Sequence, residues 1–252
     1  MSSAATPTPD ASASTNSLSR VFGVLFSPKT TFASIVSSPT WIVPILLATV
    51  LGVVVVVLFS QRVGWRAFME HEIATNPSAQ RRMDSVPADQ REQVLDQQVK
   101  VASGIGYGIA VLAPVVVALI VGGVLLLVFN IAGGTKTNFV TALSIVSYSW
   151  VPTLIRGLLG IVVLFVKDPS TIDLKNLVAS NPGALLSDDS AKWLVSLLTS
   201  LDVFTFWVLF LQAVGFSATN PKKLSVGKAF GIVFAVWFLF VAASAGLAGL
   251  FS

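Results

Sequence analysis

Long runs of apolar residues, separated by short polar segments, dominate the chain. Five runs are long enough to cross a bilayer: 41–60, 104–132, 139–166, 193–216 and 226–250. A helix needs about 20 apolar residues for this, and backbone amides must be hydrogen-bonded within the hydrocarbon core. The pattern therefore predicts an all-α membrane protein, folded as a bundle of five transmembrane helices.

The fourth run is the least regular of the five. Its first part, KWLVSLLTS (192–200), has the amphipathic spacing of a helix that lies along the membrane surface. Two interpretations stay open: a continuous span over 193–216, or a surface helix followed by a shorter span over 203–219.

Segment 61–102, between the first two runs, is the only sizeable polar region inside the chain. RVGWRAFMEHEIATN and PADQREQVLDQQVKVAS both read as helices, the second with Pro87 near its first turn, and Asn76–Pro77 separates them. We expect an extramembrane helical loop, which is either a docking site for a partner or a solvated linker.

The first 17 residues, MSSAATPTPDASASTNS, are small, polar and proline-containing. They lack the basic start and apolar stretch of a signal peptide, and they cannot bury enough apolar surface to become ordered. We expect a disordered tail over 1–17, followed by a five-span membrane domain over 18–252.

The composition strengthens the membrane assignment. Hydrophobic residues make up 54% of the chain and charged residues only 11%, against about 25% charged in a soluble domain. There is no cysteine, which excludes disulfides and thiolate metal sites. The net charge of +4 is small and scattered, so nucleic acid is not an expected partner.

The charges also predict an orientation. With five spans, the side that carries the N-terminus has six basic residues opposed only by Asp10: Arg20, Lys29, Lys136, Lys222, Lys223 and Lys228. The other side has nine basic and ten acidic residues, and six of those basic residues lie in the long 61–102 loop, where the positive-inside rule weakens. We expect a cytoplasmic N-terminus and a C-terminus on the opposite face of the cell (inner) membrane.

No residue pattern indicates catalysis, a cofactor or a metal site. HEIAT begins like a zinc-protease helix, but its fifth position is Thr75, and His71 is the only histidine in the chain. The glycine clusters lack the Lys-Ser/Thr ending of a phosphate-binding loop. We expect a protein that is not an enzyme.

Apart from Lys228 in the first turn of the fifth run, Arg156 and Asp202 are the only formal charges inside the predicted spans. They lie ten and nine residues from the same ends of two consecutive antiparallel helices, which puts both about 14–15 Å below one membrane surface. Equal depth favours a buried ion pair. Alternatively, Asp202 caps a shorter helix over 203–219 and Arg156 extends toward the headgroups or another polar group.

Three stretches resemble the Yip1 family of integral membrane proteins, specifically its prokaryotic branch. They are LFSPKTTFASIVSSPTWIVPILL (25–47), GGTKTNFVTALSIVSYSWVPTLIRGLLG (133–160) and LDVFTFWVLFLQAVGFSATNPKKLSVGKAFGIVFAVW (201–237). The resemblance extends from about Arg20 to the end of the chain. The matching positions include Pro28, Phe139, Tyr148, Pro152, Trp207 and Gly215.

The resemblance implies five membrane helices, a cytoplasmic N-terminus and no catalysis. Eukaryotic members of the family are membrane adaptors for small GTPases, and prokaryotic members sometimes accompany export machinery. We therefore expect a membrane scaffold or accessory subunit with a membrane-protein partner, for example a component of an export system. The alternative is a small-solute or ion transporter that uses Arg156 and Asp202.

Overall fold

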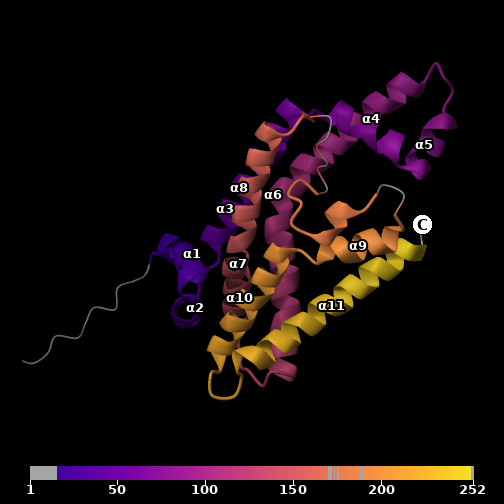
Figure 1. Cartoon of the computed structure of the whole chain (residues 1–252). Coiled ribbons are helices and arrows are strands. Elements are labelled where there is room, and N and C mark those ends of the chain that lie inside the picture. The colour runs from indigo at the N-terminus through magenta and orange to yellow at the C-terminus, as the bar shows by residue number, and fades with distance from the viewer. Residues whose placement is uncertain (1–15, 170–171, 173, 175, 188–189, 251–252) are drawn as a thin grey trace, which may run out of the picture.

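The regular elements of the computed structural model are all helices within the residues it describes, which are 16–169, 172, 174, 176–187 and 190–250 (Figure 1). In chain order they are α1 (Ser17–Phe26), α2 (Pro28–Ser37), α3 (Ile42–Arg62), α4 (Trp65–Thr75), α5 (Pro77–Asp84), α6 (Arg91–Ile131), α7 (Phe139–Ser149), α8 (Val151–Val166), η2 (Pro182–Leu185), α9 (Lys192–Ser200), α10 (Val203–Thr219) and α11 (Val226–Leu250).

Four helical segments are long and apolar enough to cross a membrane: α3, α6, α11 and the combined α7–α8. Only 17–28% of the most apolar window of each is buried within the protein, so most of their apolar side chains face outward. Such exposure is unfavourable in water and favourable in lipid. The chain is an all-helical, multi-pass membrane protein with four candidate spans, or five if the bent pair α9–α10 forms one.

The prediction of a continuous fourth span over 193–216 is wrong. The chain bends by 52° between α9 and α10, and α10 extends to Thr219. The bend has a local cause, because the carboxylate of Asp202 accepts the amide protons of Phe204 and Thr205 and so begins a new helix. The helix boundaries follow the alternative division, with α9 over Lys192–Ser200 and α10 over Val203–Thr219, and the bent pair still passes as one candidate span.

Helix α6 is the longest element, and it joins the polar loop to the membrane bundle. Its 41 residues extend about 60 Å, roughly twice the thickness of the hydrocarbon core. Its first turns project beyond the bundle together with α4 and α5, and we call this projection, residues 65–103, the head (Figure 1). The predicted helix start near Pro87 is wrong: α6 begins at Arg91, and an extra helix, α5, follows the Asn76–Pro77 break.

Aromatic packing fixes the head to the bundle. Gly64, with a φ of 84°, allows the sharp turn from α3 into α4. The next residue, Trp65, packs edge-on against Phe59 with ring centroids 5.4 Å apart. A Cβ atom at Gly106 would lie 2.2 Å from the Trp65 ring, so only glycine lets α4 sit this close to α6.

The N-terminal helices α1 and α2 pack against the side of the bundle. Phe32 and Ile35 of α2 are fully buried against α7 and α10. Most of the predicted tail, residues 1–15, lies outside the described residues. Asn16 caps α1 through its side chain, and α1 begins at Ser17.

Candidate functional site

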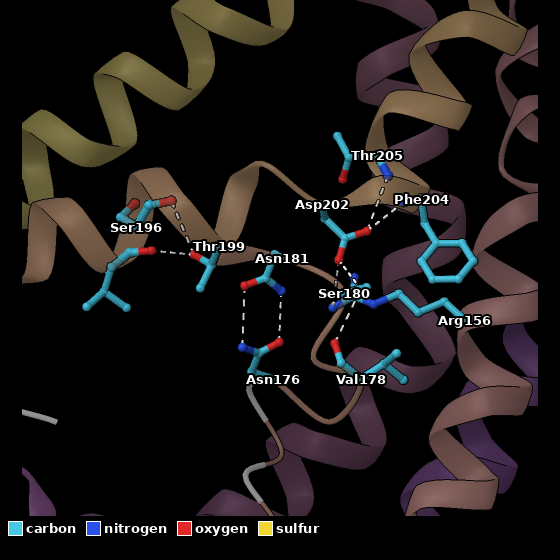
Figure 2. Close-up of polar contacts among 11 residues, drawn as sticks. Arg156, Asn176, Val178, Ser180, Asn181, Ser196, Thr199, Asp202, Phe204 and Thr205 are labelled. Carbon is cyan, nitrogen blue, oxygen red and sulfur yellow. Dashed lines mark hydrogen bonds and ion pairs between the residues drawn. The ribbon is translucent and has the colours of Figure 1, made fainter. Parts of the chain in front are cut away.

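Asp202 lies at the centre of a polar cluster inside the bundle, where α10 begins (Figure 2). Its side chain is 2% exposed. Oδ1 accepts hydrogen bonds from the backbone amides of Phe204 at 2.8 Å and Thr205 at 3.4 Å, and Oδ2 accepts a short one from the Ser180 hydroxyl. These donors and the positive end of the α10 dipole stabilise a buried carboxylate without a full ion pair.

Arg156 reaches the same carboxylate from α8. Its Nη2 lies 3.9 Å from Asp202 Oδ2, beyond hydrogen-bonding distance, and its side chain is 38% exposed. Within the described part of the chain, this loose ion pair is the only polar contact of the guanidinium. The two sequence-based alternatives therefore coexist, since Asp202 caps a helix over 203–219 and also faces Arg156.

The segment that precedes α9 carries Ser180 into the bundle. The amide of Val203 donates to the carbonyl oxygen of Ser180 at 3.3 Å, which fastens this segment to the start of α10. Asn176 and Asn181 exchange side-chain amide hydrogen bonds of 2.9 and 3.4 Å beside it (Figure 2). The polar cluster thus fixes the described part of the α8–α10 connection to the start of α10.

Two cavities reach Arg156 from different sides of α8. A cavity of about 380 Å³ lies between α3, α6 and α8, and Leu51, Gly52 and Ala110 contribute to its wall. A larger cavity of about 580 Å³ lies between α6, α8, α10 and α11. Apolar side chains predominate in both walls. The space around Arg156 is therefore suited to hydrocarbon more than to hydrated ions.

Three of the family-motif positions occupy helix starts or breaks. Pro28 is the first residue of α2, Phe139 is the first residue of α7, and Pro152 lies in the first turn of α8. Proline is tolerated there because the first amides of a helix have no intrahelical acceptor. These positions set where helices begin.

The other three motif positions are packing residues. The fully buried Tyr148 hydroxyl lies 3.3 Å from Thr40 Oγ1 and donates to the Ser17 carbonyl at 3.3 Å. A Cβ atom at Gly215 would lie 2.4 Å from Ile145, so glycine permits the contact between α10 and α7. Trp207 packs on the core formed by α2, α7 and α10.

Among the buried polar side chains, Arg20 and Gln212 were not predicted from the sequence to have a special role. Arg20 is 5% exposed and donates to the Ser38 and Ser34 carbonyls at 2.8 and 3.3 Å, with further bonds to two hydroxyls nearby. Gln212 is 4% exposed and lines the larger cavity. Arg20 precedes the first span and was counted only as a basic residue, whereas Gln212 could have been noticed as a lone amide inside an apolar run.

Among the described residues, no group of three or more His, Asp or Glu side chains could hold a metal ion. His71 lies on the head, exposed and distant in sequence from the polar cluster. The cluster itself consists of a capped carboxylate, a hydroxyl and a guanidinium. This set can hold an anion or fix a loop.

Comparison with protein families matches residues 22–247 to the Yip1 domain. The chain belongs to the Yip1 family. The match includes every candidate span and the head, so the family assignment applies to the whole membrane domain. No curated protein matches the chain significantly, and no solved structure does. Membership of this membrane-protein family is compatible with a role associated with membrane trafficking.

Proposed function

We propose that this Yip1-family protein is a non-enzymatic membrane scaffold, an accessory subunit that binds another membrane protein through its head. The main support is the head, because it is a folded projection and not an unstructured linker. Arg66 of α4 contacts Glu92 at 3.0 Å and also Asp96, both on α6. Its pKa is raised by the hydrogen bond to Glu92 and by the surrounding carboxylates.

The surface of the head supports docking. A hollow of about 320 Å³ lies between α4, α5 and the start of α6, with Ile73, Met83 and Leu95 among charged neighbours. An apolar centre with a polar rim is typical of transient protein interfaces. The long head is also what we expect of the prokaryotic branch of the family, with an export-system component as the partner.

Site-specific photocrosslinking tests the scaffold. A photoreactive residue at Gln80 or Asp89, both exposed on the head, is expected to capture a discrete protein partner in cells. The same residue at Leu239, which is 69% exposed on α11, is the matched control and is expected to capture lipid. Capture of lipid alone at all three positions would contradict the scaffold.

We further propose five spans, with α9 and α10 together forming the fourth, in the cell (inner) membrane. Under this topology the N-terminus is cytoplasmic and the C-terminus lies on the opposite face. The contact of Asn220 Nδ2 with the Gly134 carbonyl at 3.3 Å supports it, because it joins the two loops that carry Lys136 and Lys223. Both lysines line one polar pocket beside the end of α2, so these basic segments share one end of the bundle.

Cysteine labelling tests the orientation, because the natural chain has no cysteine. An impermeant reagent applied to intact cells is expected to label Asp89→Cys and to leave Lys223→Cys unlabelled. Permeabilised cells provide the control, in which both positions should react. Labelling of Lys223→Cys alone in intact cells would reverse the topology.

A transporter is the second candidate, and the observation in its favour is that two cavities reach Arg156. Ion passage requires polar groups along the path, whereas these walls are mostly apolar. We therefore expect proteoliposomes that contain the purified protein to show no more flux of small cations or anions than empty vesicles. Flux that is abolished by Arg156→Gln would favour the transporter over the scaffold.

A further inference from the structure

The larger cavity beside Arg156 has two chemically different sides. Its hydroxyl, amide and charged side chains all come from α8 and α10: Thr153, Arg156, Thr205 and Gln212. The opposite wall, from α6 and α11, is aliphatic and aromatic, and includes Ile120, Val124, Val233, Trp237 and Phe240. The cavity is therefore amphipathic across its width.

The polar side has unused hydrogen-bonding capacity. Gln212 is 4% exposed, lines the cavity, and makes no side-chain hydrogen bond within the described part of the chain. The buried side-chain atoms without a partner in the described residues are Arg20 Nε, Trp65 Nε1 and Thr137 Oγ1, so the amide of Gln212 keeps access to the cavity space. A polar atom of a molecule that enters the cavity can therefore hydrogen-bond to this amide.

The charge at the cavity is also incompletely neutralised. Arg156 lines the cavity, while Asp202 does not, and the two are 3.9 Å apart. Asp202 is satisfied by three closer donors, so the guanidinium retains donors for an anion. Among the lining residues, Arg156 is the only formally charged one.

The cavity is bounded by helices that separate from one another. Helix α11 packs closely on α10 and α9 but makes few contacts with α6, and in Figure 1 it diverges from α6 toward its C-terminal end. Several lining side chains on both helices, including Ile120 at 60% and Phe240 at 72%, are exposed. In a bilayer these exposed apolar edges adjoin lipid chains, which gives a lipid lateral access.

We propose that this cavity binds an anionic glycerophospholipid, with its phosphate at Arg156, an ester carbonyl at Gln212 and one acyl chain along the α6–α11 wall. A volume of about 580 Å³ is within the range of roughly 300–1,000 Å³ that ligand sites occupy. Thr205 and Gln212 lie two turns apart on one face of α10, about 10 Å along its axis. The side chains of Arg156 and Gln212 are long. Their polar ends can therefore reach a phosphate and an ester carbonyl of one lipid, which are only a few bonds apart. This site is inferred from the bundle alone and does not rest on the docking role proposed for the head.

Native mass spectrometry of the full-length protein in mild detergent tests this site, with dioleoyl phosphatidylglycerol as the probe and dioleoyl phosphatidylcholine as the zwitterionic comparison. We expect tighter retention of phosphatidylglycerol. Arg156→Gln should weaken it about tenfold, as loss of one charged hydrogen bond predicts, and Gln212→Leu about threefold. Arg62→Gln removes an arginine near the end of α3 that does not line the cavity, and should leave retention unchanged.

Val124→Phe provides a second variant that keeps every polar group and fills the apolar wall. It should reduce the retention of phosphatidylglycerol even if Arg156→Gln is poorly folded. Equal retention of the two lipids, or equal losses in Arg156→Gln and Arg62→Gln, would overturn the site. Arg156-dependent binding of oleate without binding of phosphatidylglycerol would overturn the glycerophospholipid in favour of a free fatty acid.

Discussion

Arg20 and Arg156 are both arginines in apolar surroundings, and the protein treats them in opposite ways. Arg20 is 5% exposed and donates four hydrogen bonds to carbonyl and hydroxyl oxygens around the end of α2. Arg156 has a 38% exposed side chain and one carboxylate 3.9 Å away. A guanidinium that donates several hydrogen bonds to neutral oxygens fixes the local structure. A guanidinium with one carboxylate beyond hydrogen-bonding distance and a neighbouring cavity is available to a ligand.

The largest effect on stability is expected at Arg20. Arg20→Leu should lower the free energy of unfolding by roughly 3 kcal/mol, because it removes the four hydrogen bonds that this buried guanidinium donates. Thermal unfolding in mild detergent measures the loss. Arg20→Lys keeps the charge but not the planar fork, and should be intermediate.

Arg62→Leu is the control for that measurement. Arg62 makes a single long bond of 3.4 Å to the Leu164 carbonyl and lies over the Phe165 ring, so its loss should be much smaller. Equal losses at Arg20 and Arg62 would show that burial does not make Arg20 an anchor.

The next largest effect is expected at Asp202. Asp202→Leu removes a helix cap and the closer of the two acceptors of the Ser180 hydroxyl, and should lower stability by about 2 kcal/mol. Arg156→Leu should lower it by less than about 1 kcal/mol, because the pair is loose and partly exposed. The double variant should resemble Asp202→Leu alone.

Asp202→Asn is the matched control, because it retains an oxygen that can cap α10. A double-mutant cycle on detergent-solubilised protein measures the coupling between the two side chains. Recovery of stability in the double variant would instead show a strong ion pair, and would make Arg156 structural like Arg20.

The smallest effect on stability is expected at Arg66. It has three carboxylate neighbours, Glu70, Glu92 and Asp96, but lies on the exposed head, where salt screens ion pairs. Arg66→Gln should leave the unfolding temperature of the bundle unchanged and speed amide hydrogen exchange in α4 at low salt. An effect that persists at high salt would contradict this purely electrostatic account.

The apolar runs predicted most of the helical segments, because a span must keep an apolar surface toward lipid and this requirement is local. The break at Leu201–Asp202 was harder to predict, since the sequence fits Asp202 equally well as an ion-pair partner and as a helix cap. The equal depth of Arg156 and Asp202 was predictable from residue counts along two helices. The hydrogen bond from the Ser180 hydroxyl to Asp202 was not predictable, because it depends on how the α8–α9 connection folds back.

The cavity and the role of Arg20 could not be read from the sequence for a related reason. Ile120, Phe240 and Gln212 look like ordinary members of separate spans until the divergence of α6 and α11 places them around one space. The acceptors of Arg20 lie on Ser34, Ser38 and Thr40, 14–20 residues further along the chain, and they reach it because α1 and α2 pack against each other. Helix rotation and helix packing decide both features.

The length of α6 has a mechanical consequence. One uninterrupted helix carries Glu92 and Asp96 in the head and, about 40 Å further along, Val121 and Val124 in the cavity wall. Between them lies Pro114, which removes one helical hydrogen bond and is the natural bending point. We expect α6 to bend at Pro114, so that a partner bound to the head shifts the wall of the cavity.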